Sequence, residues 1–393
     1  MRLYNSLTRQ LDVFSPIKEK QVTLYVCGIT PYDTTHLGHA FTYISFDLLV
    51  RFLQSQNYTV VYTQNVTDIN DRDNDILKRA KDQNTTWEKL ADFWTEKFLS
   101  DMQKLNWIQP TNYLYASKQI PQMVHIIERI IAHNKAYIKN GGVYLDREKV
   151  ANFGKLSRLT PDEMLVIAKN FDEDLENPDK KHPLDITMWR PTSENQPAHI
   201  PSFDSPWGKG RPGWHIECSA MSVSSLGDQI DIHGGGIDLI FPHHESEIAQ
   251  SESATNKIPF AKYWMHTGTV YIHGEKMSKS LGNLILVSDL LKKYSANAIR
   301  WVMLSHHYRE KWEYKEEAFM DAEKILAKIE KTLTASSIER KEETNYQQIA
   351  NELLANDLQA PELLKKLSEI TALSSQEKEE IKTILEMLGF RLQ

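Results

Sequence analysis

The sequence predicts an α/β fold built on a parallel nucleotide-binding sheet, with an insertion in the sheet domain and an α-helical C-terminal bundle. Residues 22–27 are apolar and β-rich, as in a buried parallel strand. A loop rich in Gly, Pro, Thr and Asp follows at 28–38, and a helical apolar pattern runs over 39–57. A second β-rich segment at 58–64 completes a strand–helix–strand unit, which favours a parallel sheet.

The rest of the chain alternates between helical and irregular patterns. Residues 138–210 are rich in Pro, Asp, Glu and Lys and are expected to form an irregular insertion. The other expected segments are a largely helical one at 86–137, strands and loops at 214–241, a helix at 243–251, and helices from 318 to the end with a polar break near 336–345.

Composition limits the classes of protein to consider. The 393 residues suffice for two or three domains, and a 41% hydrophobic fraction can fill a sizeable core. The net charge of −7 excludes a protein that binds nucleic acid by bulk positive charge, so any RNA contact needs a local basic patch. The sequence shows no signal-type N-terminus and no membrane-length apolar run, and it has only two cysteines. We therefore expect a cytoplasmic protein with reduced thiols.

A short histidine motif lies between the first expected strand and the helix after it. His36, Gly38 and His39 fall at a helix N-terminus, where free N–H groups and the helix dipole favour phosphate. Gly38 allows a nucleotide to approach the backbone closely. By itself, the motif is equally compatible with two polar residues at a helix start.

A second motif, KMSKS at residues 276–280, lies in an expected polar loop. Lys276 and Lys279 could neutralise the charge that builds on a departing pyrophosphate, although a solvated surface loop is the commoner meaning of such a string. In this order and on these elements, the two motifs resemble the signature of the class I aminoacyl-tRNA synthetases. The resemblance implies a Rossmann-like domain that activates an amino acid with ATP and Mg²⁺, with His36, His39, Lys276 and Lys279 as catalytic residues.

Four residues of metal-binding type are scattered along the chain: Cys27, Cys218, His243 and Glu247. His243 and Glu247 are four residues apart and share one face of an expected helix. Two thiolates, an imidazole and a carboxylate make a plausible tetrahedral zinc set. The spacing alone favours the alternative of a buried free cysteine and a surface His/Glu pair.

Longer segments around these residues resemble the cysteinyl-tRNA synthetases over about residues 20–310. The segments are YVCGIT at 25–30, GRPGWHIECS at 210–219, HGGG at 233–236 and FPHHE at 241–245. The resemblance implies that Cys27, Cys218, His243 and Glu247 bind one zinc ion, which takes the thiolate of the substrate cysteine. Because the hydroxyl of serine is a poor zinc ligand at neutral pH, such a site rejects serine without editing.

Some segments resemble a related family, the cysteine ligases of mycothiol biosynthesis, which transfer activated cysteine to an amino sugar. They are GITPYDTTHLGHA at 28–40 and NLILVS at 283–288. Other features depart from that family, which lacks the fourth zinc ligand, present here as Glu247, and has Gln in place of His233. It also carries E-R-G-G-D-P where residues 170–175 read NFDEDL. The identity of the acceptor therefore has two alternatives, tRNA and a small amine.

The resemblance to the mycothiol-type ligases also implies seven contacts with a cysteinyl adenylate, made by Thr30, Thr42, Asn65, Thr67, Trp214, Asp238 and Val270. Simpler interpretations exist for most of them. Trp214 and Val270 could pack in the core, and Thr42 and Thr67 could bond to helix or strand ends. Asp238 could be a turn residue after the glycines.

The expected organisation has five parts. They are the first half of the catalytic domain at 1–110, a connective insertion at 111–205, the second half of the catalytic domain at 206–265, a part carrying the KMSKS loop at 266–312, and a helical bundle at 313–393. Only 113 residues follow Ser280, so we expect no anticodon domain beyond the bundle.

The expected function is activation of L-cysteine with ATP and transfer to the terminal adenosine of tRNA(Cys). One alternative is transfer to an amino sugar or other small amine. Another is an inactive synthetase paralogue with a binding role, which the complete set of histidines, lysines and zinc-type residues argues against.

Overall fold

The computed structural model describes residues 1–31, 35–72, 76–277, 281–339 and 343–392. Its centre is a five-stranded sheet in the order β11-β10-β3-β4-β5, in which every neighbouring pair is parallel. The strands are β3 (Gln21–Ile29), β4 (Thr59–Val66), β5 (Asn112–Tyr115), β10 (Ile230–Gly236) and β11 (Ala261–Thr267). This sheet confirms the predicted α/β class.

The predicted strand–helix–strand unit is present as β3, α1 (Leu37–Ser55) and β4. The helix starts two residues earlier than expected, with His36 as its N-cap. Its apolar residues are buried on nearly every side, including Phe46, Leu49 and Leu53. The cause is its position, because α1 contacts β4 and β11 of the sheet and also the C-terminal helices α9 (Ala296–Leu304) and α13 (Ser375–Met387).

The second half of the sheet domain differs from the prediction. Strands and loops were expected over 214–241, but Trp214–Leu226 is a helix, α6, and only β10 follows as a strand. Helix α6 packs against α4 (Ile120–Ala132) and α7 (Glu245–Thr255). A π-helical turn, η4 (Ile240–His244), leads into α7, so the helix expected at 243–251 begins later and runs further.

The insertion is more regular than the sequence suggested. A four-stranded antiparallel sheet stands where an irregular segment was expected, and it consists of β6 (Ala136–Lys139), β7 (Gly142–Leu145), β8 (Ile186–Pro191) and β9 (Gly210–Pro212). Helix α5 (Pro161–Asn170) lies between β7 and β8. The segment expected to be largely helical contains α3 (Trp87–Lys104) and α4, but it also supplies the edge strand β5. A short helix, α2 (Ile76–Asp82), precedes α3.

Helices dominate the C-terminal part, as predicted. A small sheet of β12 (Val270–Ile272), β13 (Glu275–Lys276) and β14 (Trp312–Glu313) comes first, together with α8 (Val287–Lys293) and α9. The helices that follow are α10 (Glu316–Thr334), α11 (Tyr346–Ala355), α12 (Ala360–Ser368) and α13. The expected polar break near 336–345 falls between α10 and α11. An N-terminal hairpin, β1 (Arg2–Asn5) with β2 (Gln10–Val13), contacts β11.

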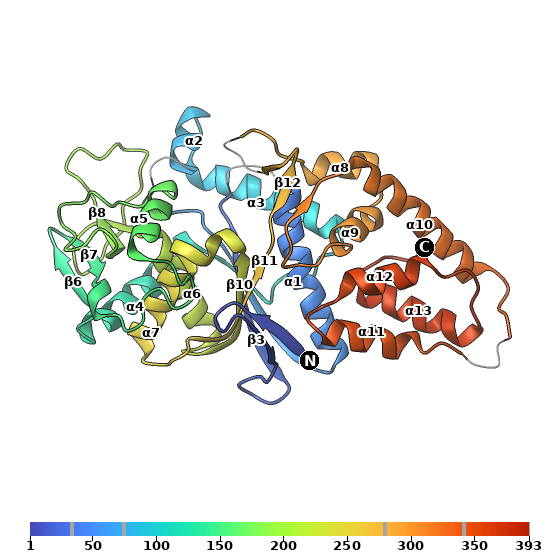
Figure 1. Cartoon of the computed structure of the whole chain (residues 1–393). Coiled ribbons are helices and arrows are strands. Elements are labelled where there is room, and N and C mark those ends of the chain that lie inside the picture. Colours follow the sequence, from blue (N-terminus) through green and yellow to red (C-terminus); the bar gives the residue numbers. More distant parts are fainter. Residues whose placement is uncertain (32–34, 73–75, 278–280, 340–342, 393) are drawn as a thin grey trace.

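Figure 1 shows the insertion at one end of the molecule, the C-terminal helices at the other, and the parallel sheet between them. A buried ion pair links the C-terminal part to α1. Arg300 on α9 is 1% exposed and donates to the carboxylate of Asp47 on α1 and to the carbonyl oxygens of Leu105 and Leu388. Among the described residues, no helix is both long and apolar enough to cross a membrane.

Candidate active site

A cavity of about 440 Å³ lies at the carboxyl ends of β3, β4 and β10, beside the N-terminus of α1. Ligands of open parallel sheets bind at this edge. The cavity brings together thirteen of the predicted site residues, which are Cys27, Thr30, His36, His39, Thr42, Asn65, Thr67, Trp214, Cys218, Asp238, His243, Val270 and Lys276. Glu247 is fully buried behind Cys27, and Lys279 lies outside the described residues.

The histidine motif stands at one side of the cavity. His36 caps α1, and its Nδ1 accepts the backbone N–H of His39 at 3.3 Å. The two imidazole rings stack with their centroids 3.7 Å apart. A Cβ at Gly38 would come within 3.0 Å of the His36 ring, so glycine permits this compact arrangement. The result is a helix N-terminus with two imidazoles at the cavity, which suits an anionic ligand.

The segment that follows the KMSKS motif is hydrogen-bonded to the start of α1. The backbone N–H of Leu37 donates to the carbonyl of Ile285 at 2.8 Å, and Val287 N–H donates to the carbonyl of Thr35 at 3.0 Å. The start of α1 and the segment after the second motif, about 250 residues apart in the sequence, therefore belong to one structural unit.

Lys276, on β13, reaches into the cavity and forms an ion pair with Asp238. The Nζ–Oδ2 distance is 3.0 Å, and both side chains are 45% exposed. Val270 is buried beside them, and its carbonyl oxygen accepts the N–H of Met277. Asp238 thus has a role that the sequence did not suggest, as the partner of the first lysine of the motif.

Other polar residues that line the cavity are held by hydrogen bonds. Gly28 N–H donates to Oδ1 of Asn65 at 2.8 Å, and Asn65 Nδ2 donates to Thr67 Oγ1 at 3.0 Å. Thr42 Oγ1 lies 2.9 Å from Thr267 Oγ1. These contacts fix the directions of the side chains that face the cavity.

The four predicted metal-binding residues meet at the floor of the cavity. One ligand atom from each of Cys27, Cys218, His243 and Glu247 lies within 4.8 Å of the others, and all four residues are buried. We call these four residues the cavity-floor cluster. They come from β3, α6, η4 and α7, so the fold of the sheet domain assembles the cluster. Both cysteines are free thiols, and the cluster could hold a metal ion.

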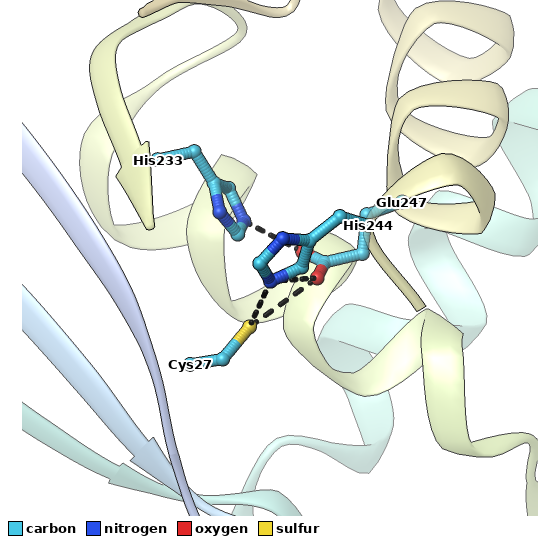
Figure 2. A group of neighbouring side chains, drawn as sticks. All are labelled: Cys27, His233, His244 and Glu247. Atoms are coloured by element: carbon cyan, nitrogen blue, oxygen red, sulfur yellow. Dashed lines mark hydrogen bonds and ion pairs between the residues drawn. The ribbon is translucent and has the colours of Figure 1, made fainter. Parts of the chain in front are cut away.

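A second set of candidate ligands overlaps the first. Figure 2 shows Cys27, His233 and His244 around Glu247. His233 Nε2 lies 2.8 Å from Glu247 Oε2, and Cys27 Sγ lies 3.3 Å from His244 Nε2. His233 and His244 are 0% exposed and do not line the cavity. In the cavity-floor cluster, by contrast, Cys27, Cys218 and His243 line it. A ligand in the cavity could therefore reach a metal ion held by the cavity-floor cluster.

Burial shapes the protonation of the cluster. Burial and the adjacent Cys218 thiol raise the pKa of the Cys27 thiol well above its usual value. Burial also raises the pKa of Glu247, and burial is the main cause that lowers the pKa of His243. The protein groups alone therefore favour their neutral forms. Since metal ligands must be deprotonated, binding of an ion here would release protons.

Trp214 separates this cavity from a second one of about 570 Å³. Its ring stacks on His243 at 4.3 Å between centroids, and the guanidinium carbon of Arg72 lies 3.9 Å from its ring centre. Behind it, His215 contacts both His243 and Glu173 of the insertion.

Sequence reasoning missed several residues that surround the cluster. Those that escaped selection are His215, His233, His244, His266 and Glu173. The first three lie within the segments 210–219, 233–236 and 241–245 that resemble the cysteinyl-tRNA synthetases, so their positions held a usable signal. His266 on β11 and Glu173 after α5 reach the site only through tertiary packing.

The chain is similar to several known proteins. The family described as "tRNA synthetases class I (C) catalytic domain" matches residues 13–324. A cysteine–tRNA ligase of Dehalococcoides mccartyi is 45% identical over 333 residues, which cover 84% of this chain and 70% of that protein. A cysteine–tRNA ligase of Legionella pneumophila is 38% identical over 379 residues, covering 94% of this chain and 79% of that protein.

Among solved structures, the methionyl-tRNA synthetase of Mycobacterium tuberculosis in complex with methionyl-adenylate is similar in fold, with a TM-score of 0.62. It shares 14% sequence identity, and the match covers 94% of this chain and 88% of that one. At this identity, the likeness concerns the fold. The family match over most of the chain and the identity to the curated relatives go further: the chain belongs to the class I cysteinyl-tRNA synthetase family.

Proposed function

We propose that this protein activates L-cysteine with ATP to form cysteinyl adenylate and transfers the cysteinyl group to tRNA(Cys). The observation that carries the proposal is the shared cavity. The cavity-floor cluster, which suits a thiol-binding metal, lines the same space as the two histidines at the start of α1 and Lys276. The names of the relatives support the same reaction.

The metal we propose is zinc, and the residues fit it. Two thiols, one imidazole and one carboxylate are a donor set that zinc accepts. The buried carboxylate of Glu247 faces Cys27 and three histidines, and burial raises its pKa. A divalent cation would favour the ionised form of that carboxylate. When bound, zinc would supply a soft Lewis acid that prefers a thiolate to a hydroxyl and so distinguishes cysteine from serine.

The cavity residues orient the two substrates. We assign the amino acid to the space beside Trp214, whose ring lies against His243. The remaining predicted contacts line the same cavity, and we assign to them the backbone of cysteine and the adenosine. Oriented in this way, a carboxylate oxygen of cysteine attacks the α-phosphorus of ATP. A new O–P bond forms, and the bond to the β-phosphate breaks to release pyrophosphate.

Charge stabilisation comes from three described side chains. His36 and His39 at the helix N-terminus and Lys276 across the cavity hold the phosphates as charge shifts to the leaving pyrophosphate. Lys279 belongs to the same proposal, and Mg²⁺ accompanies the nucleotide. The protein needs no covalent intermediate, because positioning and electrostatics supply the catalysis.

In the second step, a hydroxyl of the terminal adenosine of tRNA(Cys) attacks the carbonyl carbon of the adenylate. An ester forms and AMP leaves. The relatives reported above are named for tRNA, and no small amine appears in their names. We therefore assign the acceptor to tRNA.

Two assays test the proposal. Cysteine-dependent ATP–pyrophosphate exchange should be observed with zinc-loaded protein, and serine should not replace cysteine. A tRNA(Cys) transcript should then be charged with radiolabelled cysteine. Absence of exchange by zinc-loaded protein would disprove cysteine activation. Robust exchange without charging, with consumption of an amino sugar instead, would disprove the assigned acceptor while leaving the activation step intact.

A further inference from the structure

Glu173, in the insertion, is connected to the cavity-floor cluster through one intervening histidine. It follows α5, and its side chain is 18% exposed. Its Oε1 lies 3.1 Å from His215 Nε2 and accepts Arg72 Nη2 at 2.9 Å. The other ring nitrogen of His215, Nδ1, lies 2.9 Å from Nδ1 of His243. A continuous path of hydrogen bonds therefore runs from Glu173 to a member of the cluster.

The order of donors along this path follows from elementary chemistry. The Glu173 carboxylate accepts from the Arg72 guanidinium at 2.9 Å, and as the anion of that ion pair it can only accept from a neutral His215 ring. His215 must then carry its proton on Nε2. In the neutral ring, Nδ1 of His215 is an acceptor, and His243 must carry its proton on Nδ1. This leaves Nε2 of His243 with a free lone pair, 3.1 Å from Oε1 of Glu247.

We propose that Glu173 is a positioning residue for cysteine activation. Acting through His215, it holds the His243 ring in the tautomer and orientation that present Nε2 to the metal ion. The inference rests on the proposed function, in which His243 is a metal ligand. Outer residues of this kind commonly contribute 10–100-fold, as an order of magnitude, to metal affinity or activity.

The surroundings of Glu173 strengthen this assignment. Phe171, two residues earlier, stacks on Trp214, and Arg72 packs on the ring of the same tryptophan while it binds Glu173. The short segment 171–173 therefore contacts both Trp214, through Phe171, and His215, through Glu173. It lies within residues 170–175, the stretch that departs from the mycothiol-type pattern. The insertion thus contributes directly to the geometry of the candidate metal site.

The test uses the full chain and compares Glu173→Ala and Glu173→Gln with a matched control, Glu176→Ala. Glu176 is an exposed carboxylate that lines the same second cavity. Zinc affinity is measured by competition with a chromogenic chelator. The visible d–d absorption of cobalt(II)-substituted protein reports the ligand geometry. Exchange kinetics give KM for cysteine and for ATP separately.

For Glu173→Ala we expect about 10–100-fold weaker zinc binding, an altered cobalt spectrum and a raised KM for cysteine, with KM for ATP unchanged. Glu173→Gln should recover part of this loss, since an amide oxygen can still accept from His215. Glu176→Ala should match the wild type. Because groups that act in series are not additive, Glu173→Ala should have little further effect on zinc affinity in a His215→Phe background.

Wild-type zinc affinity and an unchanged cobalt spectrum in Glu173→Ala would overturn the inference, even if the wild-type protein activates cysteine. An equally large effect of Glu173→Ala in the His215→Phe background would also overturn it, because the residue would then act by another route. A wild-type protein that binds no zinc would disprove the metal assignment itself, and the inference with it. The wild-type measurement therefore separates failure of the proposed function from failure of the role of Glu173.

Discussion

At Gly28, a single added methyl group should displace the neighbouring Cys27 of the cavity-floor cluster from its position on the sheet. It follows Cys27 on β3, at the point where the register with β4 is interrupted between Val26 and Ile29. Its N–H donates to the side chain of Asn65. A Cβ added here would lie 2.6 Å from the carbonyl carbon of Asn65, and closer still to its oxygen.

The size of the effect follows from this contact. The carbonyl oxygen of Asn65 would lie only 1.6 Å from the added Cβ, and a Cβ essentially never comes within 3.0 Å of another heavy atom, so Gly28→Ala must move the two strands apart by roughly 1.4 Å. Metal sites tolerate about 0.2 Å in their ligand distances, and Cys27 is the adjacent residue. A displacement near 1 Å costs about 100-fold in catalysis. We therefore expect kcat/KM for cysteine to fall by about 100-fold and zinc content to fall with it.

The variant should still fold, since overpacking of this kind costs about 1–3 kcal/mol against a total stability of about 5–15 kcal/mol. The assays are cysteine-dependent ATP–pyrophosphate exchange and zinc content of the purified protein. Gly38→Ala is a graded control, because its added Cβ meets only the side chain of His36, at 3.0 Å. That variant should keep its zinc. If Gly28→Ala retains zinc and activity within threefold of the wild type, the strand contact does not position Cys27 and the reasoning fails.

Three other perturbations have expected outcomes. Cys218→Ser should lower zinc content and cysteine activation together, and full activity without bound zinc would refute the metal assignment. Arg300→Met should reduce the free energy of unfolding by about 1–3 kcal/mol in denaturant titrations, because the buried carbonyls of Leu105 and Leu388 lose their donor while the Asp47 carboxylate keeps Arg51; a loss below about 0.5 kcal/mol would contradict this. Burial lowers the pKa of His306, so below about pH 6.5 the unfolded chain binds a proton that the folded ring refuses. His306 should therefore lower the free energy of unfolding by up to about 1.4 kcal/mol for each unit by which pH falls below about 6.5. His306→Phe should make the decrease less steep. An equal slope in the variant would show that other groups cause it.

The parts of the fold that could be predicted are those with strong local patterns. The first strand–helix–strand unit combines a long apolar strand with a helix of regular apolar spacing, and both were found within a few residues of their bounds. The C-terminal helices have one buried face each, which gives a clear 3.6-residue period. Thr160 and Glu163 form a capping box that was present in the sequence and would have placed α5.

Other elements lacked such a pattern. Helix α6 is buried along most of its length between α4, α7 and the sheet, so apolar and small polar residues mix without a helical period. The strands of the insertion have only three to six residues, and β7 pairs with β8 about 40 residues away. Local sequence carries little information about such long-range antiparallel pairs.

The candidate site was predictable to the extent that its residues lie in motifs. Thirteen of the fifteen predicted site residues line the same cavity, and Glu247 lies directly behind Cys27. Glu173 could not be found in this way, because its role depends on how the insertion folds back onto α6. The pairing of Lys276 with Asp238 likewise joins two segments that only the folded chain brings together.

That pairing gives the nucleotide step the character of a counter-ion exchange. An ion pair with both side chains 45% exposed contributes at most about 1 kcal/mol, so a phosphate group can displace Asp238 from Lys276 at little cost. Since one anion replaces another, the gain in neutralised charge is small. We therefore expect nucleotide affinity to depend less steeply on salt than it would with an unpaired lysine. We expect the same exchange to free the Asp238 carboxylate, which can then accept a hydrogen bond from a hydroxyl or amino group of a substrate.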